Sequence, residues 1–304
     1  QLWHIAVGVF VSGMFWVLDY SVRKTLLGAA VDGDSVGHAM SLDTVSNNGT
    51  RMLGPILGGM FLQWVGLTGV FVFAAVGYIG AILCALSLSS AIGRSGQKGR
   101  GVISAISQSL PLLKSHPLLA GILMVTVVFN LWGFPFISMI PVIGKEILVL
   151  NSFYVGLLMG VEGCGALIGA LLIAGAGQPR HYRKLYISGL GLYLVMAIMF
   201  SQSTSSVGSG ACLLLVGLGV AAFASMQSTL ILLTAPAEAR SLMMGLLAMC
   251  IGMAPIGFLH IGLLADWLGA PTAIAILATE GLVALWWVLR RWPSLWDLQY
   301  RSAE

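Results

Sequence analysis

Charged residues are scarce in this chain, in which Asp, Glu, Lys and Arg make up only 9% of 304 residues. A soluble domain carries about 25% charged residues, so a water-soluble globular protein is excluded. Hydrophobic residues make up 58% of the chain, and its mean hydropathy is +0.95. The apolar runs are long and continuous rather than alternating, which excludes a β-barrel. The composition therefore predicts an all-α polytopic membrane protein.

Residues for metal binding or catalysis are also sparse. The four cysteines lie singly inside apolar runs, without a CxxC or Cys/His cluster, so neither a metal site nor a disulfide is expected. No Ser/His/Asp or Cys/His arrangement, HExxH motif or phosphate-binding loop is present. We therefore expect no cofactor, no enzymatic activity and no ATP-driven pump. The net charge of +4 does not indicate a nucleic-acid partner, because the basic residues lie in short loops.

Apolar runs long enough to cross a bilayer recur along the chain, since a span needs about 20 such residues. The nine predicted spans are Leu2–Asp19, Ser46–Trp64, Val70–Ser90, Leu118–Ile143, Tyr154–Ala176, Leu185–Ser201, Gly210–Thr234, Met243–Leu264 and Thr272–Leu289. The chain begins with Gln and enters an apolar run within two residues, without a signal-peptide pattern. We therefore expect the N-terminus to be a truncation.

Basic residues are distributed unequally between the two sides of these spans. Alternate loops carry 14 of the 15 Lys and Arg residues, and the opposite loops carry only Lys145. Since cytoplasmic loops are enriched in Lys and Arg, we expect the 14-residue side to be cytoplasmic. This predicts a multi-pass protein of a bacterial inner (plasma) membrane with a cytoplasmic C-terminus.

A long polar connection divides the spans into two groups. It contains the flexible piece GRSGQKGRG, and three spans precede it while six follow it. We expect residues 1–92 to be the second half of an N-terminal helical bundle and residues 93–117 to be a cytoplasmic linker. Residues 118–291 are then a C-terminal six-helix bundle, and residues 292–304 a cytoplasmic tail.

An internal repeat relates the two groups of spans. Gly59–Gly66 reads GMFLQWVG and Gly262–Gly269 reads GLLADWLG, with Gly, Trp and Gly in the same places. Upstream, Ser21–Leu42 aligns with Ser225–Leu246 at nearly the same offset. Parallel repeats of six spans are typical of one large class of secondary transporters.

Three stretches then carry a resemblance to a known family. RMLGPILGGMFL resembles the Gly-Pro helix of exporters in the major facilitator superfamily. The run from LDYSVRK to NNGTRMLGP, and the run ARSLMMGLLAMCIGMAPIGFLHIGLLADWLG, are similar to its branch of enterobactin exporters and macrolide-efflux proteins. The resemblance implies a major-facilitator fold of two pseudo-twofold-related helical bundles, with nine of twelve transmembrane helices present, namely helices four to twelve. It also implies proton-coupled export of small amphiphilic molecules of the drug, macrolide or siderophore type.

Ionisable residues inside predicted spans are candidates for transport chemistry, because they are costly in a bilayer. Glu162 and Glu280 each lie about eight residues into a span, and His260 lies in another. A carboxyl group held away from water can take up and release a proton near neutral pH. Glu162 is therefore predicted to bind a proton or a cationic substrate group. The alternative, a protonated carboxyl hydrogen-bonded to a neighbouring helix, stays open and is favoured for Glu280, just as a packing role is favoured for His260.

Charged residues near the cytoplasmic ends of spans suggest a latch or gate. Asp19, Asp43 and Arg51 are predicted to cluster there, and Glu238 and Arg240 are their counterparts in the second half. The cluster is interpreted either as fixed salt bridges between helices or as a gate that breaks in each transport cycle.

Two further sets of residues complete the candidate site. The first is the Gly-Pro helix, whose small residues permit close helix contact: Gly54, Pro55, Gly58 and Gly59. The second is a set of polar and aromatic residues at membrane depth that are candidates to line a cavity: Asn130, Trp132, Phe134 and Gln227. Pro135 and Pro141 are expected to break the helix that carries three of the second set.

The leading interpretation is a secondary active transporter that works by alternating access, with a small molecule, protons and the lipid bilayer as its partners. We expect it to be monomeric. Uptake or lipid flipping on the same scaffold is the alternative, because a fold does not determine the direction of transport. A membrane-embedded enzyme or receptor is disfavoured, since the predicted outer loops are short.

Overall fold

Helices are the only regular secondary structure among the residues that the computed structural model describes, which are 8, 11, 36–88, 111–176 and 181–296. Seven of these helices are long and apolar enough to cross a membrane, so the predicted all-α membrane fold is confirmed. The main elements are α2 (Val36–Leu88), α4 (Pro117–Val128), η2 (Phe129–Gly133), η3 (Phe134–Met139), α5 (Ile140–Val142), η4 (Ile143–Ile147), α6 (Ser152–Ala176), α7 (Tyr182–Ser201), α8 (Ser206–Thr234), α9 (Arg240–Ile251), α10 (Ala254–Leu268) and α11 (Ala270–Arg291).

The first predicted spans differ from the structure at their boundaries. The span Leu2–Asp19 lies outside the described residues, apart from Gly8 and Val11. The next two spans both fall in α2, where Gly66 interrupts the helical backbone. The first arm of α2 begins at Val36, ten residues before the predicted Ser46, because the polar residues in between form helix rather than loop.

Glycines at matched positions of the internal repeat have the same unusual backbone conformation. Gly66 has φ 73° and ψ −178°, and Gly269 has φ 80° and ψ 156°, a region that is essentially restricted to glycine. Each glycine joins two apolar helical segments. Two residues earlier, Trp64 and Trp267 are 72% and 76% exposed. The sequence repeat is therefore also a repeat of local structure.

One membrane-length helix is irregular in its middle. It runs from Pro117 to Ile147, but it changes from α-helix to π-helix at Phe129 and to 3-10 helix at Phe134. Pro135 and Pro141 lie within this stretch, and proline lacks the N–H that an α-helix requires. The helix is thus distorted where the prolines lie, but it is not broken as predicted, because the stretch stays helical from Pro117 to Ile147.

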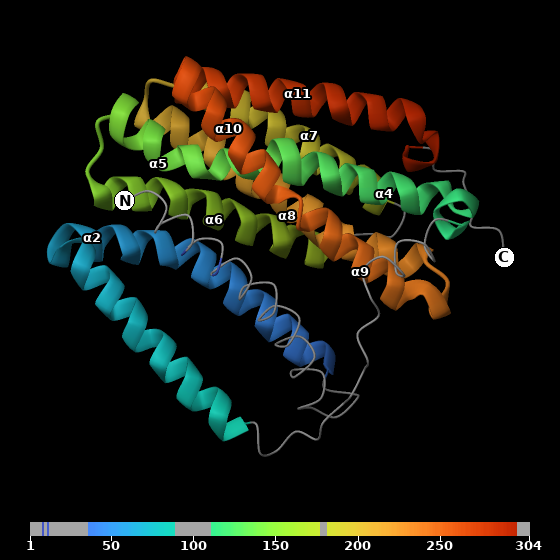
Figure 1. The fold of residues 1–304 in the computed structure, drawn as a ribbon, viewed down its shortest axis with the longest axis horizontal. Helices are drawn as coiled ribbons and strands as arrows, with labels where there is room; N and C mark the ends of the chain where they lie inside the picture. The colour runs from blue at the N-terminus through green and yellow to red at the C-terminus, as the bar shows by residue number, and fades with distance from the viewer. Residues whose placement is uncertain (1–7, 9–10, 12–35, 89–110, 177–180, 297–304) are drawn as a thin grey trace. The chain divides into compact units, whose positions relative to one another are not determined.

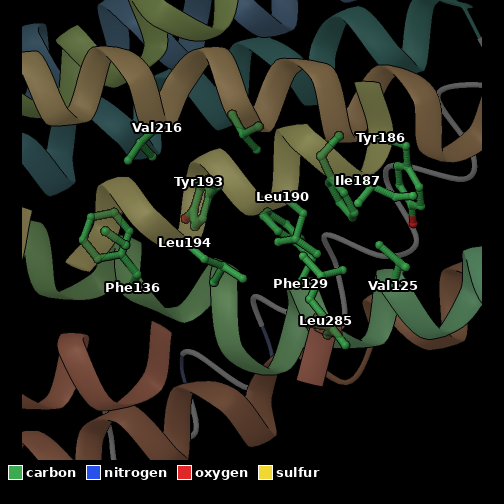
Figure 2. Close-up of a cluster of buried hydrophobic side chains, with 14 of the residues drawn as sticks. Val125, Phe129, Phe136, Tyr186, Ile187, Leu190, Tyr193, Leu194, Val216 and Leu285 are labelled. Carbon is green, nitrogen blue, oxygen red and sulfur yellow. The ribbon is translucent and has the colours of Figure 1, made fainter. Parts of the chain in front are cut away.

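The buried core of the C-terminal helices is aromatic and lies between the irregular helix, α7 and α8. The Phe223 ring stacks with two others: its centroid lies 4.3 Å from that of Phe129 and 4.9 Å from that of Tyr186. Figure 2 shows Phe129, Phe136, Tyr186 and Tyr193 pointing into this cluster. Large aromatic side chains thus hold these helices together.

Two compact units divide the chain. One contains residues 1–49 and 68–97, and the other contains residues 50–67 and 98–304. In the second unit, α8 packs along both α6 and α7, and α11 packs against α7 and α10 (Figure 1). The Gly-Pro segment of α2 thus belongs to the same unit as α6 to α11.

Candidate functional site

Arg51 and Glu162 form a two-pronged ion pair between α2 and α6. The guanidinium Nη2 donates to Glu162 Oε1 at 2.6 Å, and Nε donates to Oε2 at 3.2 Å. The Glu162 side chain is 4% exposed and the Arg51 side chain 32%. Paired hydrogen bonds of this kind are strong and directional. The pair therefore fixes the position of α2 relative to α6 at this point.

Glu162 lies near the middle of α6, ten residues after its start and fourteen before its end. Arg51 lies midway between Val36, the first described residue of α2, and Gly66, fifteen residues from each. The stretch of α2 that is long and apolar enough to cross a membrane runs from Gly49 to Cys84, so Arg51 lies near its start. That Arg51 marks the cytoplasmic end of its span stays a prediction. An ion pair at this depth of α6 is costly to maintain in a bilayer and makes the two residues the candidate site.

Glycines of α6 bring its backbone against the Gly-Pro segment. A β-carbon at Gly156 would collide with the Pro55 carbonyl oxygen, and one at Gly163 would lie 2.6 Å from Met52 Cα. Gly160 lies between them and faces Ile56. Because residue numbers rise along α6 as they fall along α2, the two helices are antiparallel here. Only small residues permit such a close approach.

Pro55 changes the hydrogen bonding of the residue that carries the site. Since proline has no N–H, the Arg51 carbonyl lacks the donor that residue i+4 supplies in an α-helix. This oxygen faces Gly163, whose β-carbon would lie 2.9 Å from it. The sequence Arg-Met-Leu-Gly-Pro thus places a cationic side chain and a carbonyl without its helical donor against the same turn of α6.

A second ionisable cluster joins α10, α11 and the π-helical segment η2. Trp132 Nε1 donates to Glu280 Oε2 at 3.0 Å, and His260 Nδ1 lies 3.7 Å from the same oxygen. The side chains of His260 and Glu280 are 39% and 41% exposed. The structure therefore brings together three residues that the sequence singled out separately.

Asn130 and Gln227 belong to a buried polar network in the C-terminal helices. Gln227 Nε2 donates to Thr126 Oγ1 at 3.0 Å, and Asn130 Nδ2 donates to the Thr126 carbonyl at 2.9 Å. The Tyr186 hydroxyl lies 2.9 Å from Thr126 Oγ1 and donates to the Ile122 carbonyl. This network positions the two amide groups on neighbouring helices.

The remaining predicted residues occupy separate places. Phe134 packs against Phe129 and Phe258. Gly59 contacts α6, whereas no described atom lies within 4 Å of a β-carbon at Gly54 or Gly58. Two further residues, Glu238 and Arg240, are exposed and form no salt bridge with any described residue. Asp19 and the side chain of Asp43 lie outside the described residues.

The sequence of the first two thirds of the chain identifies the family. A model described as Major Facilitator Superfamily matches residues 1–205. The chain belongs to the Major Facilitator Superfamily. Its function is accordingly membrane transport rather than enzymatic catalysis.

Individual members of the superfamily are distantly similar. An uncharacterized MFS-type transporter of Bacillus subtilis (strain 168), YfiS, is 25% identical over 307 residues, covering 94% of this chain and 72% of YfiS. A bacterial homologue of the human lysosomal transporter Spinster, in an inward-facing and unoccupied conformation, matches with a TM-score of 0.62 and 14% identity over 92% of this chain and 76% of that one. A bacterial homologue of the iron transporter ferroportin, in an inward-facing state, matches with a TM-score of 0.61 and 17% identity, covering 89% of this chain and 66% of that one. The two structures share the major-facilitator fold with this chain.

The sequence alone did not predict which residues Glu162 and Glu280 contact. The Arg51–Glu162 pair joins residues 111 positions apart, and the Trp132–Glu280 hydrogen bond joins residues 148 apart. A signal for the first was present in VGLLMGVEGCG, where Gly156, Gly160 and Gly163 recur at helical spacing on one face. That spacing marks a helix contact beside Glu162.

Proposed function

We propose that this chain is a proton-coupled secondary transporter that exports small amphiphilic molecules by alternating access. The observation that carries the proposal is the bidentate ion pair that joins Arg51 of α2 to Glu162, near the middle of α6. Residues 1–92 and 118–291 are proposed as the two moving bundles, with residues 93–117 as their linker. The contact of α2 with α6 is then the place where the bundles meet.

Protonation of Glu162 couples the proton to this movement. A neutral carboxyl group would leave the Arg51 guanidinium without a counter-charge near the bilayer midplane. Breaking a buried pair in this way costs about 3–5 kcal/mol. Arg51 must then turn to water or to another acidic group, which requires α2 to move away from α6. The glycine-lined contact favours such movement, because no large side chains interlock between Pro55 and Gly156.

The proposed substrate path runs beside the irregular helix. Asn130, Trp132, Phe134 and Gln227 are proposed to line it, since broken helices in membranes occur next to cavities. The chain is proposed to act as a monomer in the bacterial plasma membrane with its C-terminus in the cytoplasm. The support for this orientation is the distribution of the basic residues along the sequence: without Arg51, which lies inside α2, 13 of the remaining 14 are on one side.

A comparison of uphill transport with exchange tests the coupling. Glu162→Gln mimics the protonated acid permanently, so proteoliposomes should lose transport of ethidium and erythromycin against a gradient when a pH difference is imposed. The variant should retain exchange of labelled for unlabelled substrate, because exchange needs no net proton movement. Glu146→Gln, which removes an exposed carboxylate at the end of η4, is the matched control and should transport normally. Uphill transport by Glu162→Gln at the wild-type rate would refute the proposed role.

A further inference from the structure

Glu280 is a carboxylate near the middle of a membrane helix that lacks a permanent counter-charge. It lies ten residues after the start of α11 and eleven before its end. Its side chain is 41% exposed, whereas Glu162, also near the middle of its helix, is 4% exposed and paired with Arg51. Among the described residues, no Lys or Arg lies within salt-bridge distance of Glu280, and the nearby titratable group is His260.

The surroundings of Glu280 are those of a hydrogen-bond acceptor. Trp132 Nε1 donates to its Oε2 atom, and the imidazole of His260 lies beside the same oxygen. The Oε1 atom accepts no hydrogen bond from a described residue, and the side chain is accessible. One oxygen is therefore held in place while the other stays available to a further donor. An indole ring next to it adds an electron-rich face that attracts cations.

We propose that Glu280 binds the positively charged headgroup of an amphiphilic organic cation, an amine or quaternary centre on an apolar body, where α10, α11 and η2 meet. The inference rests on the proposed function, because it names the chemical class of the exported molecules. Leu263 and Val283 lie three residues after His260 and Glu280, on the same faces of α10 and α11, and their side chains are 48% and 60% exposed, so they offer apolar surface to the body of such a molecule. The carboxylate supplies the charge that distinguishes a cation from a neutral molecule of the same shape.

Equilibrium binding of labelled tetraphenylphosphonium to the purified protein in nanodiscs tests the proposal without transport. This cation carries a permanent charge and no transferable proton. Glu280→Gln should weaken binding at least tenfold, and Trp132→Phe, which keeps a ring but loses the N–H, should weaken it severalfold. Glu146→Gln removes an exposed carboxylate at the end of η4 and should leave binding unchanged. Uncharged triphenylphosphine oxide should not displace the probe.

Equal affinity of Glu280→Gln and wild type for tetraphenylphosphonium would overturn the proposal. The absence of saturable binding by the wild type would also overturn it, and would leave Glu280 as a proton carrier only. If Glu280→Gln does not fold, Trp132→Phe decides, and wild-type affinity of that variant would count against the site. Binding that depends on Glu280 in a protein that shows no uphill transport would refute the proposed function while leaving the cation site in place.

Discussion

Substitution of Gly156 by alanine tests how closely the backbones of α2 and α6 approach. The added methyl group would overlap the Pro55 carbonyl oxygen and lie 3.2 Å from Gly59 Cα. Both are backbone atoms of α2, so no side chain can rotate away to relieve the overlap. The helices must move apart by roughly 1 Å to restore ordinary contact distances. Overpacking of this kind costs about 1–3 kcal/mol.

A matched substitution in the same helix separates this effect from helix propensity. Gly175 also lies in α6, and no described atom lies within 4 Å of a β-carbon there. Exchange of glycine for alanine in a helix gains about 0.5–1 kcal/mol, and this gain applies to both variants. The difference between Gly156→Ala and Gly175→Ala therefore isolates the contact, at about 1–3 kcal/mol.

Thermal unfolding in detergent, followed by size-exclusion chromatography, measures the difference. Gly156→Ala should unfold several degrees below Gly175→Ala. Separation of α2 from α6 in Gly156→Ala should also lengthen the hydrogen bonds from Arg51 to Glu162. Uphill transport should therefore be impaired in Gly156→Ala but not in Gly175→Ala. Equal unfolding midpoints for the two variants would show that the backbones are not in contact at Gly156, and the reasoning about the site would fail with it.

Four further substitutions probe the backbone and the buried network, each measured as a thermal unfolding midpoint. Alanine at Gly66 or Gly269 should destabilise the protein by about 1–3 kcal/mol, because both have a backbone conformation that side chains disfavour; a neutral effect would contradict the assigned turns. Tyr186→Phe should cost about 1 kcal/mol, since the Ile122 carbonyl loses one of its two hydroxyl donors and keeps the Thr126 hydroxyl; an unchanged midpoint would show that the Thr126 hydroxyl or water replaces the lost donor. Val149→Asn should stabilise by about 1 kcal/mol, because Val149 is 82% exposed and has φ 51°, where asparagine is tolerated and valine is strained; a lower midpoint would show that the valine side chain makes a contact that matters.

Local patterns predicted the helices and the repeat because each depends on neighbouring residues. Apolar runs of about 20 residues specify spans wherever they occur, and the matching segments GMFLQWVG and GLLADWLG end at two glycines, Gly66 and Gly269, that have a similar backbone conformation. Pro135 likewise marked the irregular stretch of its helix, since the missing N–H is a property of the residue itself.

Tertiary partners could not be predicted in the same way. Nothing in the residues around Arg51 specifies that an acidic partner lies 111 positions away at Glu162. Hydropathy also did not indicate that α2 is helical before Ser46, because a polar stretch that is helical looks like a loop when only hydropathy is considered.

The two midpoint carboxylates place different demands on the protein. Glu162 is neutralised within the described chain by a guanidinium that meets both of its oxygens, so its charge can be lost only if Arg51 finds another partner. Glu280 has a neutral indole donor and an imidazole near one oxygen, so its charge can be met by a molecule from outside. A proton at the first and an organic cation at the second would each remove one negative charge from the membrane interior. Because the two acids lie on different helices, the order of these events is set by helix movement rather than by direct competition. This separation predicts that Glu280→Gln lowers affinity for cations without abolishing exchange of uncharged substrates, whereas Glu162→Gln abolishes uphill transport of both.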